Sequence, residues 1–225
     1  MKFLEYTPLA RVNAFLSNVN LGDCHIQGAL EAYSCKVAGM DKKLSRSLDQ
    51  EVLDSLNFSS SLSTSPVGPL STSASRRTLI YLILTLNHMY PDYDFSMLRA
   101  HHFCKESGLS AAKQKIEHFL LEASKVWAAE VGDETPLMDC LWTTIDEVMD
   151  LADCDVYACV PDFEGDPFAD QGSIWSFNYF FYNKKLKRIL CFSCRCVSKM
   201  ALDQWTEEDV SEVEYEFIEG MDMEE

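Results

Sequence analysis

The segment Gly172–Val197, GSIWSFNYFFYNKKLKRILCFSCRCV, constrains the fold most, because this densest aromatic stretch of the chain has the pattern of one long β-hairpin. In the first arm, strict alternation puts four aromatic side chains on one face: Trp175, Phe177, Tyr179 and Phe181. In the second arm, Leu190, Phe192, Cys194 and Cys196 share one face, with Ile189 and Cys191 opposite them. A hairpin this apolar cannot stand alone in water, so we expect helices or further strands to cover it.

The remaining elements follow from hydrophobic spacing and from turn residues. Helices are predicted at Pro8–Leu16, Met40–Leu56, Thr78–Met89, Ser110–Glu130 (capped by Ser110) and Pro136–Leu151. Strands are predicted at Asp23–Cys35, with a bulge at Gly28, and at Cys154–Val160. The fold class is therefore α/β (α+β), a single domain with a central antiparallel sheet of about four strands flanked by helices.

Two segments differ from this body in composition. In Asn57–Ser75, ten of nineteen residues are Ser or Thr, and Pro66, Gly68 and Pro69 interrupt any periodicity. Such a segment buries too little apolar surface to offset its ordering entropy, so we predict a disordered linker. Residues 203–225 hold eleven acids and no Lys or Arg, and form an acidic tail. The predicted division is 1–39 and 76–202 for the globular domain, 40–75 for a mobile regulatory linker and 203–225 for the tail.

The charge and the cysteines exclude several classes of protein. Most of the net charge of −17 belongs to the tail, and the remaining body is mildly acidic, which makes it a poor binder of DNA phosphates. We therefore expect no direct sequence-specific nucleic-acid binding, and action through other proteins. Nine cysteines, with no secretory segment and no apolar run of about 20 residues, indicate a soluble intracellular protein with free thiols and no membrane partner.

No motif indicates catalysis or a cofactor. The chain has no nucleophile elbow, phosphate-binding loop or dinucleotide fingerprint, and its candidate carboxylates lie where turns favour Asp: Asp92, Asp94, Asp155, Asp162 and Asp166. A zinc site at Cys191, Cys194 and Cys196 is disfavoured because strand alternation points Cys191 away from the other two. The group His101, His102 and Cys104 has no obvious fourth ligand. We expect no enzyme, no metal and no cofactor.

Several short patterns are candidate regulatory sites. The hairpin turn contains four cations: Lys184, Lys185, Lys187 and Arg188. They are a candidate nuclear-import signal, or simply the charges of a solvated turn that protect the strands from edge pairing. The Met40–Leu56 helix is an amphipathic surface helix or an export signal, with the candidate residues Leu44, Leu48, Val52, Leu53 and Leu56. A phosphate at Ser45 would place negative charge beside these leucines and could mask them. The phosphorylation candidates are Ser45, Ser47, Ser65, Ser75, Thr78, Thr206 and Ser211.

The run WSFNYFFYNKKLKRILCFSCR closely resembles a block of the eukaryotic Maf-type global repressors of RNA polymerase III transcription, as found in a plant member. Further blocks agree in order: MKFLE at Met1–Glu5, EAYSCKVAGMDKKL at Glu31–Leu44 and PDYDF at Pro91–Phe95. The resemblance implies a non-enzymatic repressor that binds the polymerase and blocks its recruitment by the TFIIB-related initiation factor. It also implies kinases, phosphatases and nuclear transport receptors as partners, and shuttling between nucleus and cytoplasm with phosphorylation state.

The polymerase-contact residues are proposed from their expected exposure: Asp92, Asp94, Asn178, Tyr182, Lys187 and Arg188. The interleaved apolar and acidic residues of the tail suit a basic surface, such as a nucleic-acid cleft in the polymerase. The alternative function is a cytosolic α/β domain that binds a ligand or catalyses a reaction in a pocket beside the Trp175 face.

Overall fold

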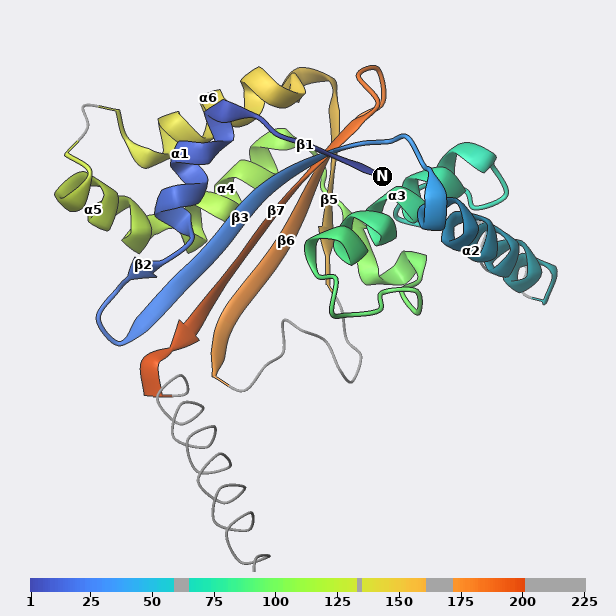
Figure 1. Cartoon of the computed structure of the whole chain (residues 1–225), viewed down its shortest axis with the longest axis horizontal. Coiled ribbons are helices and arrows are strands. Elements are labelled where there is room, and N and C mark those ends of the chain that lie inside the picture. The colour runs from blue at the N-terminus through green and yellow to red at the C-terminus, as the bar shows by residue number, and fades with distance from the viewer. Residues whose placement is uncertain (59–64, 133–134, 161–171, 201–225) are drawn as a thin grey trace, which may run out of the picture.

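The computed structural model describes residues 1–58, 65–132, 135–160 and 172–200. A seven-stranded sheet crosses the molecule in the order β1-β3-β7-β6-β5-β4, and β2 also pairs with β3 (Figure 1). Every strand pair is antiparallel. The strands are β1 Lys2–Leu4, β2 Val19–Asn20, β3 Cys24–Ser34, β4 Phe103–Lys105, β5 Cys154–Cys159, β6 Ser173–Asn183 and β7 Arg188–Ser198. The predicted fold class is confirmed, and the sheet exceeds the expected four strands because three short strands of two or three residues extend it.

Helices cover both faces of the sheet. On one face lie α1 Thr7–Leu16, α4 Leu109–Phe119, α5 Leu121–Glu130 and α6 Leu137–Met149, and on the other lie α2 Gly39–Phe58 and α3 Ser73–Met89 (Figure 1). Two short 3-10 helices, η2 Ala100–His102 and η3 Leu151–Asp153, precede β4 and β5. Among the described helices, none is long and apolar enough to cross a membrane.

The hairpin of β6 and β7 is confirmed, with the predicted faces. The Trp175 face packs against the first group of helices together with Phe192 and Cys194. Phe180 and Cys191 belong instead to the core under α3. The two cores lie on opposite sides of one sheet, which explains why both faces of this hairpin are apolar.

Two local predictions are wrong. Gly28 forms no bulge, because its pairing with Cys194 belongs to an unbroken β3–β7 register. Glycine at this position instead allows the side chains of Cys194 and Leu16 to pack close to the backbone. A Cβ added to Gly28 would lie 3.2 Å from the Cys194 Sγ and 3.4 Å from the Leu16 Cβ. The bulge lies in β6, between Ser173 and Trp175. The single helix expected over Ser110–Glu130 is two helices that meet at Leu120, and α4 begins after Gly108, with no side-chain cap from Ser110.

The disorder predicted for Asn57–Ser75 is wrong for residues 57–58, which end α2, and for residues 65–75, while 59–64 lie outside the described residues. Val67 and Leu70 are buried, and the Thr72 side chain accepts a hydrogen bond from the Ser75 amide to cap α3. The guanidinium of Arg76 donates to the Leu70 and Ser71 carbonyls at 3.0 Å. These hydrogen bonds, together with the burial of Val67 and Leu70 in the core under α3, supply the ordering energy that the Ser-rich composition lacks.

Candidate protein-binding surface

The four cations of the import candidate lie together at the β6–β7 turn. The Asn183 side chain holds this turn by accepting from the Leu186 amide at 2.9 Å and donating to the Met149 carbonyl at 2.8 Å. Lys184 pairs with Asp155 and Lys185 with Asp153, each at 2.7 Å. Arg188 is half-buried, where it donates to the Val148 carbonyl at 3.1 Å. The cluster is therefore an ordered turn, and its role in import stays a prediction.

The expected exposure of two polymerase-contact candidates is wrong. Asn178 is 2% exposed because it lies in the middle of the sheet, between Cys159 of β5 and Ser193 of β7. Tyr182 is 9% exposed, with its ring in edge contact with that of Tyr81 on α3. Neither residue presents a large surface to a partner.

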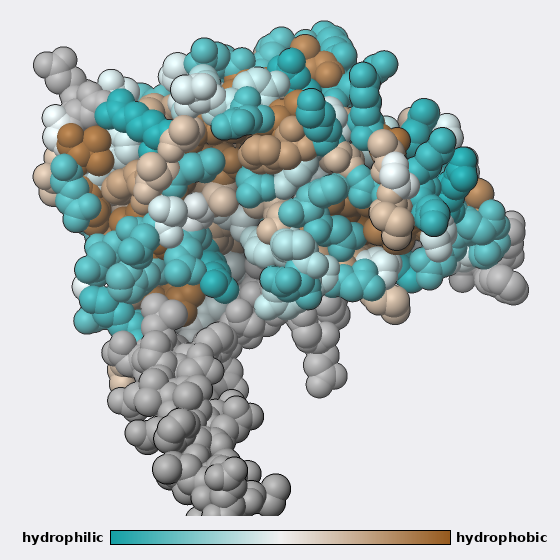
Figure 2. Space-filling view, viewed as in Figure 1, coloured by the Kyte–Doolittle hydropathy of each residue, from teal (hydrophilic) through white to brown (hydrophobic). Residues whose placement is uncertain are grey.

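The other contact candidates form two separate groups. Asp92 and Asp94 are exposed in the turn after α3, where the Asp94 carboxylate accepts from the Ser96 amide at 2.9 Å. The hydroxyl of Tyr90, just before this turn, bonds to that of Ser193 near the middle of β7. Lys187 and Arg188 lie instead at the hairpin turn, where β7 begins. On the viewed face, hydrophobic residues are interspersed with hydrophilic ones (Figure 2).

The helix of the export candidate, α2, is docked on α3 through its leucines. Leu48 is buried, while Leu44, Val52 and Leu56 are partly buried against the same core. Leu53 is half-buried. The candidate export residues are thus largely covered while α2 is docked.

Three polar contacts tether α2 from outside this apolar seam. Asp41 contacts His88 at 3.0 Å, Asp49 pairs with Arg76 at 2.7 Å, and Glu51 pairs with Arg99 at 3.1 Å. Sequence reasoning missed these tethers. The nearest signal in the sequence was the pair of arginines, Arg76 and Arg77, between the phosphorylation candidates Ser75 and Thr78.

Two of the phosphorylation candidates are inaccessible in the folded chain. Ser75 is 8% exposed and Thr78 is 3% exposed, and the Thr78 hydroxyl donates to the Ala74 carbonyl within α3. The prediction of kinase access at these residues is wrong for this conformation, because α3 begins earlier than its apolar pattern indicated. Ser45 is half-buried and Ser47 is exposed on α2, and the Ser65 hydroxyl donates to the Gly68 carbonyl at 2.6 Å. Thr206 and Ser211 lie outside the described residues.

The residues weighed for metal binding or catalysis make structural contacts. His102 accepts a hydrogen bond from the Arg99 amide at 2.8 Å, and the described residues contain no cluster of three or more His, Cys, Asp or Glu placed to hold a metal. Burial raises the pKa of Cys191 well above the usual thiol value, as expected for a packed rather than a reactive cysteine. Burial alone would raise the pKa of Asp155, but hydrogen bonds from Lys105 and Lys184 lower it overall. Asp162 and Asp166 lie outside the described residues.

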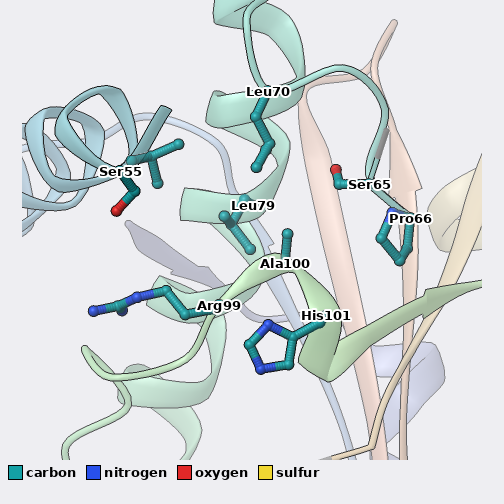
Figure 3. Close-up of a pocket in the computed structure, with 9 residues that line it drawn as sticks. Ser55, Ser65, Pro66, Leu70, Leu79, Arg99, Ala100 and His101 are labelled. Carbon is teal, nitrogen blue, oxygen red and sulfur yellow. The ribbon is translucent and has the colours of Figure 1, made fainter. Parts of the chain in front are cut away.

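A pocket of about 340 Å³ lies between α2, the 65–70 turn and η2, and not beside Trp175. Leu70, Leu79 and Ala100 line it with the ring of His101, and Ser55 borders it from α2 (Figure 3). The Trp175 face is filled by α4, whose Phe119 ring lies 5.0 Å from that of Trp175. Trp175 does not line this pocket, and the ligand site expected beside it stays a prediction.

Comparison with known proteins places the chain among relatives. A family model described as Maf1 regulator matches residues 26–193. The Repressor of RNA polymerase III transcription of Dictyostelium discoideum is 34% identical, across 90% of this chain and 87% of that protein. The chain belongs to the Maf1 regulator family. The Repressor of RNA polymerase III transcription maf1 of Schizosaccharomyces pombe is 38% identical, across 88% of this chain and 84% of that protein.

Solved structures of the Maf1 family agree with the fold. Citrus MAF1, crystallised in two space groups, is similar to this chain with TM-scores of 0.71 and 0.68. The identities are 47% and 49%, over 85% and 86% of this chain and 100% and 98% of the citrus chains. The family resemblance seen in the sequence blocks is therefore confirmed by the family model, by the two relatives and by the structure of a plant member.

Proposed function

We propose that this Maf1 family protein represses RNA polymerase III transcription by binding the polymerase and blocking its recruitment by the TFIIB-related initiation factor. The observation that carries the proposal is the match along nearly the whole chain to relatives named as repressors of this polymerase. The folded body acts sterically, by occupying a polymerase surface that the initiation factor needs. The exposed Asp92–Asp94 turn and the hairpin turn with Lys187 are the two contact regions that we propose.

We propose further that phosphorylation and nuclear export switch the repressor off. Support comes from the position of Ser45, one helical turn from Asp41 and one turn from Asp49. These two carboxylates hold α2 to α3 through His88 and Arg76. A phosphate of charge about −1.5 to −2 at Ser45 repels both carboxylates and competes for Arg76.

Loosening of α2 would uncover its leucines, since Leu44, Leu48 and Val52 pack against the α3 core while the helix is docked. The proposed switch therefore works in the opposite direction to the one expected from the sequence, in which a phosphate masks the leucines. Here, packing against α3 covers the leucines, and a phosphate on Ser45 exposes them to an export receptor. Shuttling between nucleus and cytoplasm, with kinases, phosphatases and transport receptors as partners, follows from this switch.

The test uses the full chain as bait in nuclear extract, with mass spectrometry of the captured proteins. Wild type, Ser45→Glu and Ser47→Glu are compared, the last as a control on the exposed side of the same helix. We expect RNA polymerase III subunits with wild type and Ser47→Glu, and weaker capture with Ser45→Glu. Absence of the polymerase from all three samples would contradict the proposed function, and equal capture by all three would contradict the Ser45 switch alone.

A further inference from the structure

A cationic surface lies where α3, the end of β3 and the hairpin turn meet, and we name it the Tyr182 corner. Its exposed cations are Lys36, Arg77, Lys184 and Lys187. The rings of Tyr81 and Tyr182 complete it, and both Tyr81 and Lys184 contact the Tyr182 ring. The Tyr81 and Tyr182 rings are 5.9 Å apart at 66°, and the Lys184 ammonium lies 5.9 Å from the Tyr182 ring centroid. The Cys35 amide donates to the Lys187 carbonyl at 2.9 Å, which brings the chain next to Lys36 into the same corner.

The corner has an excess of positive charge. Within the described part of the chain, Lys36, Arg77 and Lys187 are exposed and form no ion pair with a carboxylate, and the Arg77 Nε donates to the Ser73 carbonyl. Lys184 pairs with Asp155, but that single carboxylate also pairs with Lys105 at 2.7 Å. One acid therefore faces two ammonium groups, and the neighbouring cations are left to attract an anion.

The two tyrosines add hydrogen-bond donors to this charge. Burial raises the pKa of both Tyr81 and Tyr182, so each keeps its hydroxyl proton at physiological pH. A protonated phenol beside a cation can donate to a carboxylate. The corner thus combines exposed cations with the half-buried ring of Tyr81, which suits an acidic peptide that also carries aromatic residues.

We propose that the acidic tail of this chain docks on the Tyr182 corner of the same molecule. The tail fits by charge, because residues 203–225 hold eleven acids and no Lys or Arg. It also fits by composition, because Tyr215 and Phe217 alternate with glutamates and can pack on the half-buried ring of Tyr81. Its carboxylates bind Arg77, Lys184 and Lys187.

The length of the tail permits this contact. The described chain ends at Met200, just past β7, and the corner lies at the other end of that strand. At about 3.3 Å per residue, the eleven residues of Arg188–Ser198 span about 35 Å. Residues 201–214, fully extended, reach about 45–50 Å, so the segment that follows them can lie on the corner. Tethering also keeps its effective concentration near the millimolar range.

Docking would cover Lys184 and Lys187, two of the import candidates, and would so restrain import of the free protein. This consequence rests on the proposed function, but the contact itself does not. Phosphate at Thr206 or Ser211 would strengthen docking by adding negative charge, and salt would weaken it.

The test is zero-length carbodiimide cross-linking of the purified full chain, mixed in equal parts as ¹⁴N and ¹⁵N protein and read by mass spectrometry. The Lys115–Glu106 pair, at 2.7 Å, is the internal positive control. We expect tail acids to couple to Lys36, Lys184 and Lys187 within single-isotope molecules, and 0.5 M salt to reduce this about tenfold. Three results would each overturn the proposal. They are tail cross-links spread evenly over exposed lysines such as Lys125, tail cross-links found only between a ¹⁴N molecule and a ¹⁵N molecule, and the absence of any tail cross-link.

A pair of charge-reversal variants tests the corner directly. Arg77→Glu with Lys187→Glu should lower tail coupling to Lys184 about tenfold, because like charges repel the tail. The matched control, Lys43→Glu with Lys125→Glu, changes the net charge equally at exposed positions elsewhere and should lower it less than about twofold. Equal coupling in both variants would refute the corner as the docking site. Retention of the Lys115–Glu106 cross-link reports that each variant is folded.

Discussion

Replacing Arg76 by Met should destabilise the protein and loosen α2 on α3, because the buried Arg76 guanidinium joins α2, α3 and the segment before α3. It donates to the Asp49 carboxylate at 2.7 Å and to the Leu70 and Ser71 carbonyls at 3.0 Å. Carbonyls that lose a charged donor cost about 1–3 kcal/mol, and the half-exposed pair with Asp49 adds less than about 1 kcal/mol. We expect a loss of about 1–4 kcal/mol in the free energy of unfolding, which lowers Tm by about 2–16 °C for a chain of this size.

The control is Arg77→Met, one position along the same helix, where the side chain is exposed and bonds only to Ser73. That change should cost less than about 0.5 kcal/mol. Denaturant unfolding measures both variants, and hydrogen exchange of the α2 amides separates local detachment from global unfolding. Equal stability of the two variants, or unchanged exchange in α2 for Arg76→Met, would refute the assignment of Arg76 as the tether.

Three further predictions concern the sheet. Gly28→Ala should destabilise the protein by about 1 kcal/mol in denaturant unfolding, since the new Cβ meets the buried Cys194 Sγ at 3.2 Å, and a gain in stability would show that the neighbours can yield. Asn13→Ala should lower the free energy of unfolding by about 1–3 kcal/mol in the same measurement. The Asn13 side chain accepts a hydrogen bond from the Leu30 amide at 2.7 Å and donates one to the Leu30 carbonyl at 2.9 Å. An unchanged unfolding midpoint would mean that water replaces the Asn13 side chain. Hydrogen bonds from Lys105 and Lys184 lower the pKa of Asp155, so the Asp155 carboxylate stabilises the fold above the ordinary Asp pKa of about 4, and this stabilisation is lost as pH falls below that value. The Tm difference between wild type and Asp155→Asn should therefore shrink between about pH 5 and pH 2. A Tm difference that stays constant over this range would contradict the prediction.

Part of the candidate site could be predicted from the sequence because it depends on neighbouring residues. The four cations of the hairpin turn lie within the five residues Lys184–Arg188, so their clustering needs no tertiary information. The leucine spacing of α2 likewise predicted one apolar face at Leu44, Leu48 and Val52, which the structure confirms by their burial. The family blocks are also local strings, and their order identified the family.

Other features of the site depend on residues far apart in the chain. Burial of Asn178 follows from strands on both sides of β6, and burial of Thr78 follows from the docking of α3 on the sheet. The order of residues 65–75 rests in part on the burial of Val67 and Leu70 in a core shared with α2, α3 and the sheet. The Tyr182 corner likewise joins α3 to the hairpin turn, about one hundred residues later in the sequence.

By itself, the sequence determined the two-faced hairpin, most helices and the α/β class, because side-chain periodicity follows directly from backbone geometry. Only the tertiary structure decided that the sheet gains short strands at its edges, that α4 and α5 separate at Leu120, and that ion pairs add to the leucine contacts of α2. Those features arise from contacts between distant segments, whose energies outweigh local propensity and leave no periodic trace in the sequence.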